Sequence, residues 1–145
     1  MITIDAAATL LHNTLEVDAV LADANHLTSA GRIFKTTKRP SGFQNPTLTI
    51  RLIPSDLTGE QRFALEWLLW LNLYLQDKAS LTPDHSRAGR IETRLDALID
   101  NKEFSDSNVT RLVIDRYLPT GSPLSDPDAP DESLWQFQYY ARAMN

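Results

Sequence analysis

Residues 64–77 constrain this chain more than any other stretch, because they form its most apolar run. Their side chains alternate in kind along the second half of the run. Leucines occupy the odd positions, at Leu69, Leu71, Leu73 and Leu75, and different residues occupy the even ones, at Trp70, Asn72, Tyr74 and Gln76. A period of two is typical of a strand with two unlike faces, whereas a helix would mix these residues on one side. The run therefore predicts a long central strand.

Length, charge and composition limit the number of domains and the kinds of site that the chain can have. A chain of 145 residues is expected to form one domain, residues 1–145. It has no cysteine, which excludes disulfides and thiolate metal sites. Its net charge of -5 argues against general binding to nucleic acid backbones. The first residues lack a secretory pattern, and polar residues interrupt the longest apolar run, so we expect a soluble intracellular protein with no membrane partner.

The remaining elements follow the order helix, three strands, helix, two strands. Helices are predicted at residues 5–21 and 83–101, and strands at residues 31–37, 47–53, 109–118 and 135–143, besides the central one. Strands that follow one another directly favour antiparallel pairing, and the first two are expected to form an extended hairpin. The predicted fold is α+β, a two-layer sandwich in which a curved antiparallel sheet of about five strands carries two helices on one face.

Finer expectations follow from single residues. Asp5 is expected to cap the first helix, whose apolar stripe extends to Ala19. On the second helix, Asp84 or Pro83 is expected to begin the first turn, and the charged residues Arg90, Glu92, Arg94 and Asp96 are expected to face solvent. The proline-rich residues 119–133 are expected to form a loop.

No catalytic or metal-binding motif is present in the sequence. There is no nucleophile elbow, phosphate-binding loop or dinucleotide glycine pattern, and His12, His26 and His85 lack the spacing of a zinc site. The acidic loop Asp126, Asp128, Asp131 and Glu132 offers hard-cation ligands without the spacing of an EF-hand, which favours a solvated loop. We therefore expect no enzyme, cofactor or metal. A small α+β enzyme or ligand-binding domain remains an alternative, and it would require a pocket with convergent polar groups.

The loop between the first two strands carries Lys38, Arg39 and Phe43. Basic and aromatic side chains together can hold nucleic acid. One such loop in an acidic chain favours instead a flexible or protein-contacting loop, and no sequence-specific binding of nucleic acid is predicted.

Large side chains occupy the strand faces opposite the predicted core. Leu68, Trp70 and Tyr74 lie opposite the leucines, and Tyr140 lies opposite Trp135 in the last strand. If the helices cover only the leucine face, these residues leave an apolar patch, and such patches mark protein interfaces. A curled sheet or a covering loop is the structural alternative. The sequence therefore predicts an interface at Leu68, Trp70, Tyr74 and Tyr140, with Lys38, Arg39 and Phe43 on a projecting loop.

The layout of elements resembles the tail terminator (tail completion) proteins of tailed bacteriophages. The resemblance rests on residues 46–53 (Pro-Thr-Leu-Thr-Ile-Arg-Leu-Ile), residues 62–67 (Arg-Phe-Ala-Leu-Glu-Trp), the helix around residues 91–99 and the closing residues 135–140 (Trp-Gln-Phe-Gln-Tyr-Tyr). It implies a structural protein of the virion tail, at the head–tail junction, after assembly in the host cytoplasm.

The implied partners are further copies of the chain in a ring, commonly a hexamer, the tail tube protein that the ring caps and the head–tail connector protein that docks on it. Two alternatives stay open: another head–tail connector, neck or tail-tube-like subunit, and an adaptor or immunity-type interaction protein.

Overall fold

The computed structural model describes residues 2–35, 45–54, 64–78, 82–119, 121–126 and 129–144. The helices are α1 (Ile4–Glu16) and α2 (His85–Ile99), with a 3-10 turn, η1 (Ala30–Arg32). The strands are β1 (Ile33–Phe34), β2 (Thr47–Pro54), β3 (Ala64–Gln76), β4 (Lys102–Phe104), β5 (Arg111–Leu118), β6 (Leu124–Asp126) and β7 (Ala129–Met144).

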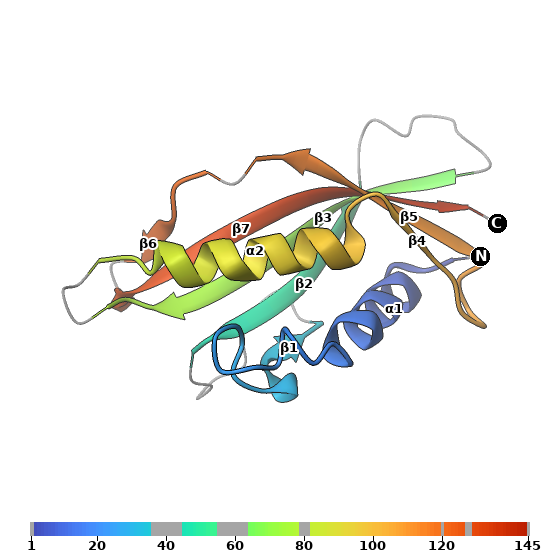
Figure 1. Cartoon of the computed structure of the whole chain (residues 1–145). Coiled ribbons are helices and arrows are strands. Elements are labelled where there is room, and N and C mark those ends of the chain that lie inside the picture. Colours follow the sequence, from blue (N-terminus) through green and yellow to red (C-terminus); the bar gives the residue numbers. More distant parts are fainter. Residues whose placement is uncertain are drawn as a thin grey trace.

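The strands form one curved sheet in the order β1-β2-β3-β7-β5-β4, with β6 beside β7. The two longest strands, β3 and β7, are antiparallel neighbours from Ala64 opposite Met144 to Gln76 opposite Glu132. Both α1 and α2 lie on the same face of this sheet (Figure 1). The predicted α+β class is confirmed, and the strands expected at residues 64–77 and 135–143 are its centre.

The sheet is mixed, because β1 pairs with β2 in parallel, with Ile33 opposite Leu48. The predicted hairpin between these strands is therefore wrong. The connection over residues 35–46 is about a dozen residues, which is the length at which a chain can cross back and start a second strand in the same direction. The fact that the two strands are consecutive in the sequence could not reveal that they pair in parallel.

The first helix begins and ends earlier than predicted. The Thr3 side chain, and not that of Asp5, accepts the capping hydrogen bond from the backbone nitrogen of Ala6, over 3.1 Å. Beyond Glu16 the Asp18 carboxylate accepts a hydrogen bond from the backbone nitrogen of Leu21, over 2.9 Å. This local bond competes with a further helical turn, so residues 17–21 lie outside α1 and Ala19 is exposed. In α2, of the two residues expected to begin the first turn, Asp84 is the cap, and its carboxylate accepts a hydrogen bond from the backbone nitrogen of Arg87.

Short strands account for the other differences. The residues expected to be a loop, 119–133, contain β6 and the beginning of β7, where Leu124 pairs with Leu134. β4 was not predicted at all and pairs with the middle of β5. Both β4 and β6 have three residues, too few to carry an alternating pattern of their own. Each forms because its backbone can hydrogen-bond to a longer strand, β5 for β4 and β7 for β6.

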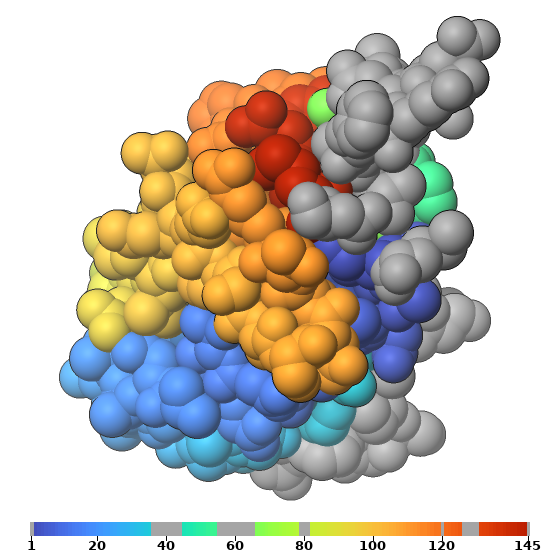
Figure 2. Space-filling view, turned by 90° about the vertical axis from the view of Figure 1, so that its right-hand side faces the viewer, coloured from blue at the N-terminus to red at the C-terminus, as the bar shows by residue number. Residues whose placement is uncertain are grey.

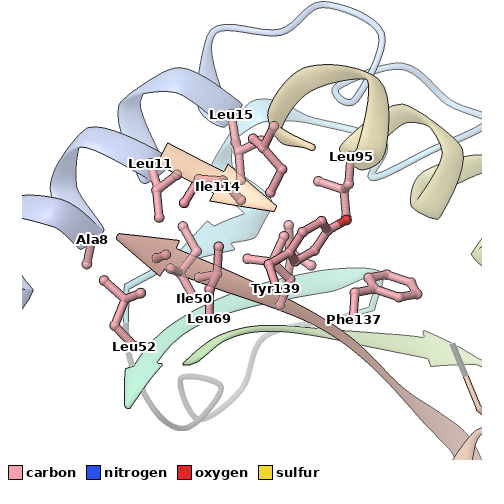
Figure 3. Packing of buried hydrophobic residues seen from close by; sticks show 14 of the residues in the cluster. Ala8, Leu11, Leu15, Ile50, Leu52, Leu69, Leu95, Ile114, Phe137 and Tyr139 are labelled. Atoms are coloured by element: carbon pink, nitrogen blue, oxygen red, sulfur yellow. The ribbon is translucent and has the colours of Figure 1, made fainter. Parts of the chain in front are cut away.

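The core lies between the helices and the leucine face of the sheet (Figure 3). Leu69, Leu71 and Leu73 are completely buried, as the alternation predicted. Leu11 and Leu15 of α1, and Leu95 of α2, pack from above against Ile50, Phe137 and Tyr139 of the sheet. The even positions of β3 and β7 therefore form the opposite surface of the sheet, which we call the outer face.

Candidate interaction surface on the outer face of the sheet

The register of the strands brings the predicted interface residues together on the outer face. Leu68 of β3 lies between Ile53 of β2 and Tyr140 of β7. Two residues further along β3, Trp70 lies opposite Arg51 and Gln138, and Tyr74 follows at the far end of the same face. The four residues Leu68, Trp70, Tyr74 and Tyr140 thus share one surface across the two central strands.

These side chains are half-buried, so the surface is less open than the sequence suggested. The Arg51 guanidinium lies over the Trp70 ring, 5.6 Å from its centre, where the positive charge meets the negative face of the indole. The rings of Tyr117 and Tyr140 meet edge to face, with centres 4.4 Å apart. Contacts within the outer face therefore cover part of the Trp70 and Tyr140 rings.

Polar groups interrupt the apolar ones on this surface. The Gln136 side-chain amide donates to Asn72 Oδ1 over 3.1 Å, across the β3–β7 pair. The Thr47 and Thr49 hydroxyls and Trp70 Nε1 are buried without a hydrogen-bond partner among the described residues, which is unfavourable in a protein interior. The outer face is therefore a mixed surface and not a second hydrophobic core.

Tyr117 of β5 also belongs to the outer face, and sequence analysis missed this residue. The β5–β7 register is regular up to Arg116, which lies opposite Tyr139 on the helix-covered face, and it shifts only after this residue, so that Leu118 pairs with Gln138. Tyr117 is 42% exposed and packs on Tyr140. The signal that could have found it is the alternation of β5 itself, which places Tyr117 on the face opposite the buried Leu112 and Ile114.

Charged residues surround the two tyrosines. Glu66, Asp115, Tyr140 and Arg142 line a hollow of about 240 Å³ at this end of the sheet. Arg142 approaches Asp115 over 3.4 Å, whereas the half-buried Glu66 carboxylate has no hydrogen bond or ion pair with any described residue. We call Tyr117, Tyr140, Glu66, Asp115 and Arg142 the tyrosine patch. Burial, then the Tyr117 hydroxyl and the Glu66 charge, raise the pKa of Tyr140, which keeps its hydroxyl protonated as a donor.

The opposite side of the molecule is organised around α2. Residues 17–29, which we call the strap, lie directly against this helix (Figure 2). Arg94 donates to both carboxylate oxygens of Asp18, over 2.5 and 2.9 Å, and Arg87 donates to the backbone oxygen of Ala24 over 2.6 Å. Arg94, expected in solvent, is thus bound to the strap. The same expectation is wrong for Glu92 and Asp96, which pair with Arg116.

The contact between Asp18 and Arg94 makes stability dependent on pH. The hydrogen bond from Arg94 lowers the pKa of Asp18 below its ordinary 3.8, against the opposing effect of burial. A lowered folded-state pKa stabilises the fold above pH 3.8, and the contribution is lost as the pH falls below 3.8. We expect Asp18→Asn to lower the free energy of unfolding at pH 7 and to flatten its fall below pH 4, measured by urea unfolding over a pH series. An unaltered slope in the variant would contradict this assignment.

The other residues singled out in the sequence are dispersed. Lys38, Arg39, Phe43 and Asp128 lie outside the described residues. Asp131 accepts a hydrogen bond from the Gln76 amide at the end of β3, and Glu132 accepts one from the amide of Asn45, which precedes β2. Within the described ranges no group of three or more potential metal ligands occurs.

The three histidines have different contacts, although His26 and His85 line the same hollow beside α2. His12 contacts the backbone oxygen of Ile33, His26 contacts Asp23, and His85 packs edge-on against Trp135. Neither helix in the described part is long and apolar enough to cross a membrane.

Comparisons with known proteins identify the fold. No protein-family model matches the sequence, and no curated protein matches it. One solved chain, which carries no functional description, is 14% identical with a TM-score of 0.66, covering 99% of this chain and 96% of that chain. Another belongs to the virion of a native gene transfer agent particle and is 12% identical with a TM-score of 0.67, covering 95% of this chain and 94% of that chain. At these identities the likeness shows a common fold.

Proposed function

We propose that this chain is a structural virion protein that caps the tail tube as a ring and provides the docking surface for the head connector. The observation that carries the proposal is the common fold with a chain of a gene transfer agent virion, over almost the full length of both chains. The outer face adds support, because neither α1 nor α2 covers it and aromatic side chains lie on it. Aromatic residues are enriched in protein interfaces.

The narrower assignment to a tail terminator depends on the element pattern and its resemblance to that family. The common fold favours the wider class of virion subunits, and another head–tail connector or tube-like subunit has equal support from it. The partner separates these roles. A terminator binds the end of a preformed tail tube, a connector binds the head portal side, and a tube-like subunit extends a tube by itself.

The test is native mass spectrometry and negative-stain electron microscopy of the purified chain, alone and mixed with the tail tube protein of the same genome. We expect closed rings, found at the tube ends in the mixture, and tubes of limited length. Rings that do not bind to tubes but do bind the portal-side protein would favour the connector role. A chain that stays monomeric in both samples would contradict the proposal.

Substitutions on the outer face are expected to weaken assembly more than folding. Trp70 and Tyr74 are half-buried on a surface that the helices leave uncovered, so Trp70→Ala or Tyr74→Lys removes contact area available to a partner. We expect at least about a tenfold weaker association for each, as for aromatic interface residues elsewhere. Light scattering across a dilution series measures this constant, and Trp70→Phe, which keeps an aromatic ring, is the control. Unchanged particle mass in both variants would count against an interface here.

A further inference from the structure

Gly89 in the middle of α2 has no evident role within a single copy of the chain. Glycine is the least favourable helix residue after proline, because its backbone loses the most conformational entropy when the chain folds. Its backbone lies within an unbroken helix, and a methyl group built on it would meet no atom within 4 Å. Neither backbone conformation nor internal packing therefore explains a glycine at this position. An open position of this kind permits the close approach of another surface.

Hollows flank α2 on both sides of Gly89. One has a volume of about 660 Å³ and extends towards the strap, between His26 and Ala97. The other, of about 240 Å³, extends towards the sheet, where Trp135 forms part of its wall. Gly89 and His85 line both hollows, so the two hollows meet at this part of the helix surface. We call His85, Gly89, Arg90, Thr93 and Ala97 the α2 saddle.

The saddle and the tyrosine patch carry complementary charged groups. Arg90 of the saddle is exposed and donates only its Nε, to the backbone oxygen of Asn25 over 3.3 Å, so its two terminal nitrogens have no partner in the described part of the chain. Glu66 of the tyrosine patch is half-buried and likewise has no hydrogen-bond or ion-pair partner there. The saddle also has short side chains at its floor, whereas the patch presents two tyrosine rings. The Glu66 carboxylate and the two terminal nitrogens of Arg90 thus have opposite charges and could form an ion pair between copies.

We propose that the α2 saddle of one copy receives the tyrosine patch of the next copy, with Glu66 of one subunit paired to Arg90 of its neighbour. The helix α2, which carries the saddle, lies on one face of the sheet (Figure 1), whereas Glu66 and Tyr140 of the patch occupy outer-face positions of β3 and β7. An interface between two different surfaces is head-to-tail, and it closes into a ring when the rotation per subunit allows. The inference rests on the ring proposed above and names the surfaces that build it.

Charge exchange tests this pairing. Glu66→Arg alone places two arginines together at every interface, and Arg90→Glu alone places two glutamates together. We expect each variant to associate at least about tenfold more weakly than the wild-type chain in light scattering and native mass spectrometry. An equimolar mixture of the two is expected to assemble again. In an alternating ring, the introduced arginine of one variant meets the introduced glutamate of the other, and at the next interface the native Glu66 meets the native Arg90.

The mixture also supplies its own control for folding, because misfolded subunits could not rescue each other. The rings are expected to contain both variants in equal number, which requires an even subunit count such as that of a hexamer. Native mass spectrometry distinguishes them after isotopic labelling of one variant. Assembly of each variant alone at the wild-type strength, or failure of the mixture to assemble, would overturn the pairing.

Gly89 gives a second and independent test. Gly89→Ala and Gly89→Tyr are both expected to fold at least as stably as the wild-type chain, because the space above the helix is open and both residues favour a helix more than glycine does. We expect Gly89→Tyr to fill the saddle and abolish ring formation, and Gly89→Ala to retain most of it. Rings formed by the tyrosine variant would overturn the inference while leaving the proposed function standing. A wild-type chain that forms no ring, alone or with tube protein, would remove both.

Discussion

Replacement of Arg116 by methionine is expected to lower the free energy of unfolding by about 2–3 kcal/mol. Arg116 lies on the helix-covered face of β5 and is 17% exposed. It pairs with Glu92 over 2.7 Å and with Asp96 over 2.8 Å, both on α2, and donates to the Tyr139 hydroxyl over 3.1 Å. Its guanidinium also lies 4.9 Å from the centre of the Tyr139 ring. This one side chain joins α2 to two strands of the sheet.

The expected loss comes mainly from the groups that the substitution would leave behind. Burial disfavours the charged form of Arg116, yet Tyr139, Glu92 and Asp96 together raise its pKa, so the charge is retained. Burial also raises the pKa of Tyr139 far above its usual value, and its hydroxyl donates to Asp96. Methionine would fill the space but leave two carboxylates close together without a cation. Because Asp96 is 38% exposed, water compensates in part, and we expect less than the loss for a fully buried pair.

Arg142→Met is the matched control for this prediction. Arg142 lies on the neighbouring strand but on the outer face, 48% exposed, and its contact with Asp115 is 3.4 Å long. Surface pairs of this kind contribute at most about 1 kcal/mol. Urea unfolding followed by circular dichroism at pH 7 measures both variants at concentrations too low for assembly. Losses of equal size in the two variants would show that the Arg116 cluster has no special role in stability.

The strength of the sequence prediction lies in the two central strands. Alternation in β3 and β7 separates Leu71 and Phe137 from Trp70 and Tyr140 correctly, because the two faces of these strands differ sharply in polarity. A strand buried on one face repeats this contrast at every second residue. The alternation therefore predicted both the core and the arrangement of the candidate interface residues on one surface.

The parts that were not predicted depend on partners distant in the sequence. Glu92 and Asp96 have the helical spacing of a solvated face, and only the fold brings Arg116 against them. The parallel pairing of β1 and β2 depends on where the intervening chain travels, which local pattern does not encode. The extra residue in β5, which pairs Leu118 with Gln138, has no sign in the alternating pattern. Each of these features arises from tertiary packing that overrides a local preference.

The outer face also depends on residues that are distant in the sequence. The sequence indicated which side chains lie there, but their exposure is decided by neighbours on other strands. Arg51 covers Trp70, and Tyr117 covers part of Tyr140. Glu66 and Arg90, which we infer to pair between copies, lie on different layers and have no sequence pattern in common. Only the fold shows that the charged groups of these two side chains lack partners within the described part of one copy.

Leu71→Ala is expected to lower the free energy of unfolding by about 2–5 kcal/mol. Leu71 is completely buried at the centre of the sheet, opposite Ile50 of β2 and Phe137 of β7. Truncation removes apolar contacts and leaves a cavity, and the rigid strands on both sides limit collapse around it. The upper part of the range applies if the neighbouring strands do not move. Denaturant unfolding at low protein concentration measures the loss.

Leu68→Ala is the sharpest control, because it makes the same substitution in the same strand on the other face. Leu68 is half-buried between Ile53 and Tyr140, so its truncation opens a surface hollow that water can enter. We expect less than half the loss of Leu71→Ala in the monomer, together with weaker assembly, which Leu71→Ala should affect only through folding. Equal losses of monomer stability would mean that the outer face is as tightly packed as the core. A surface packed in that way could not serve as an interface, because a partner would have no apolar area left to bury there.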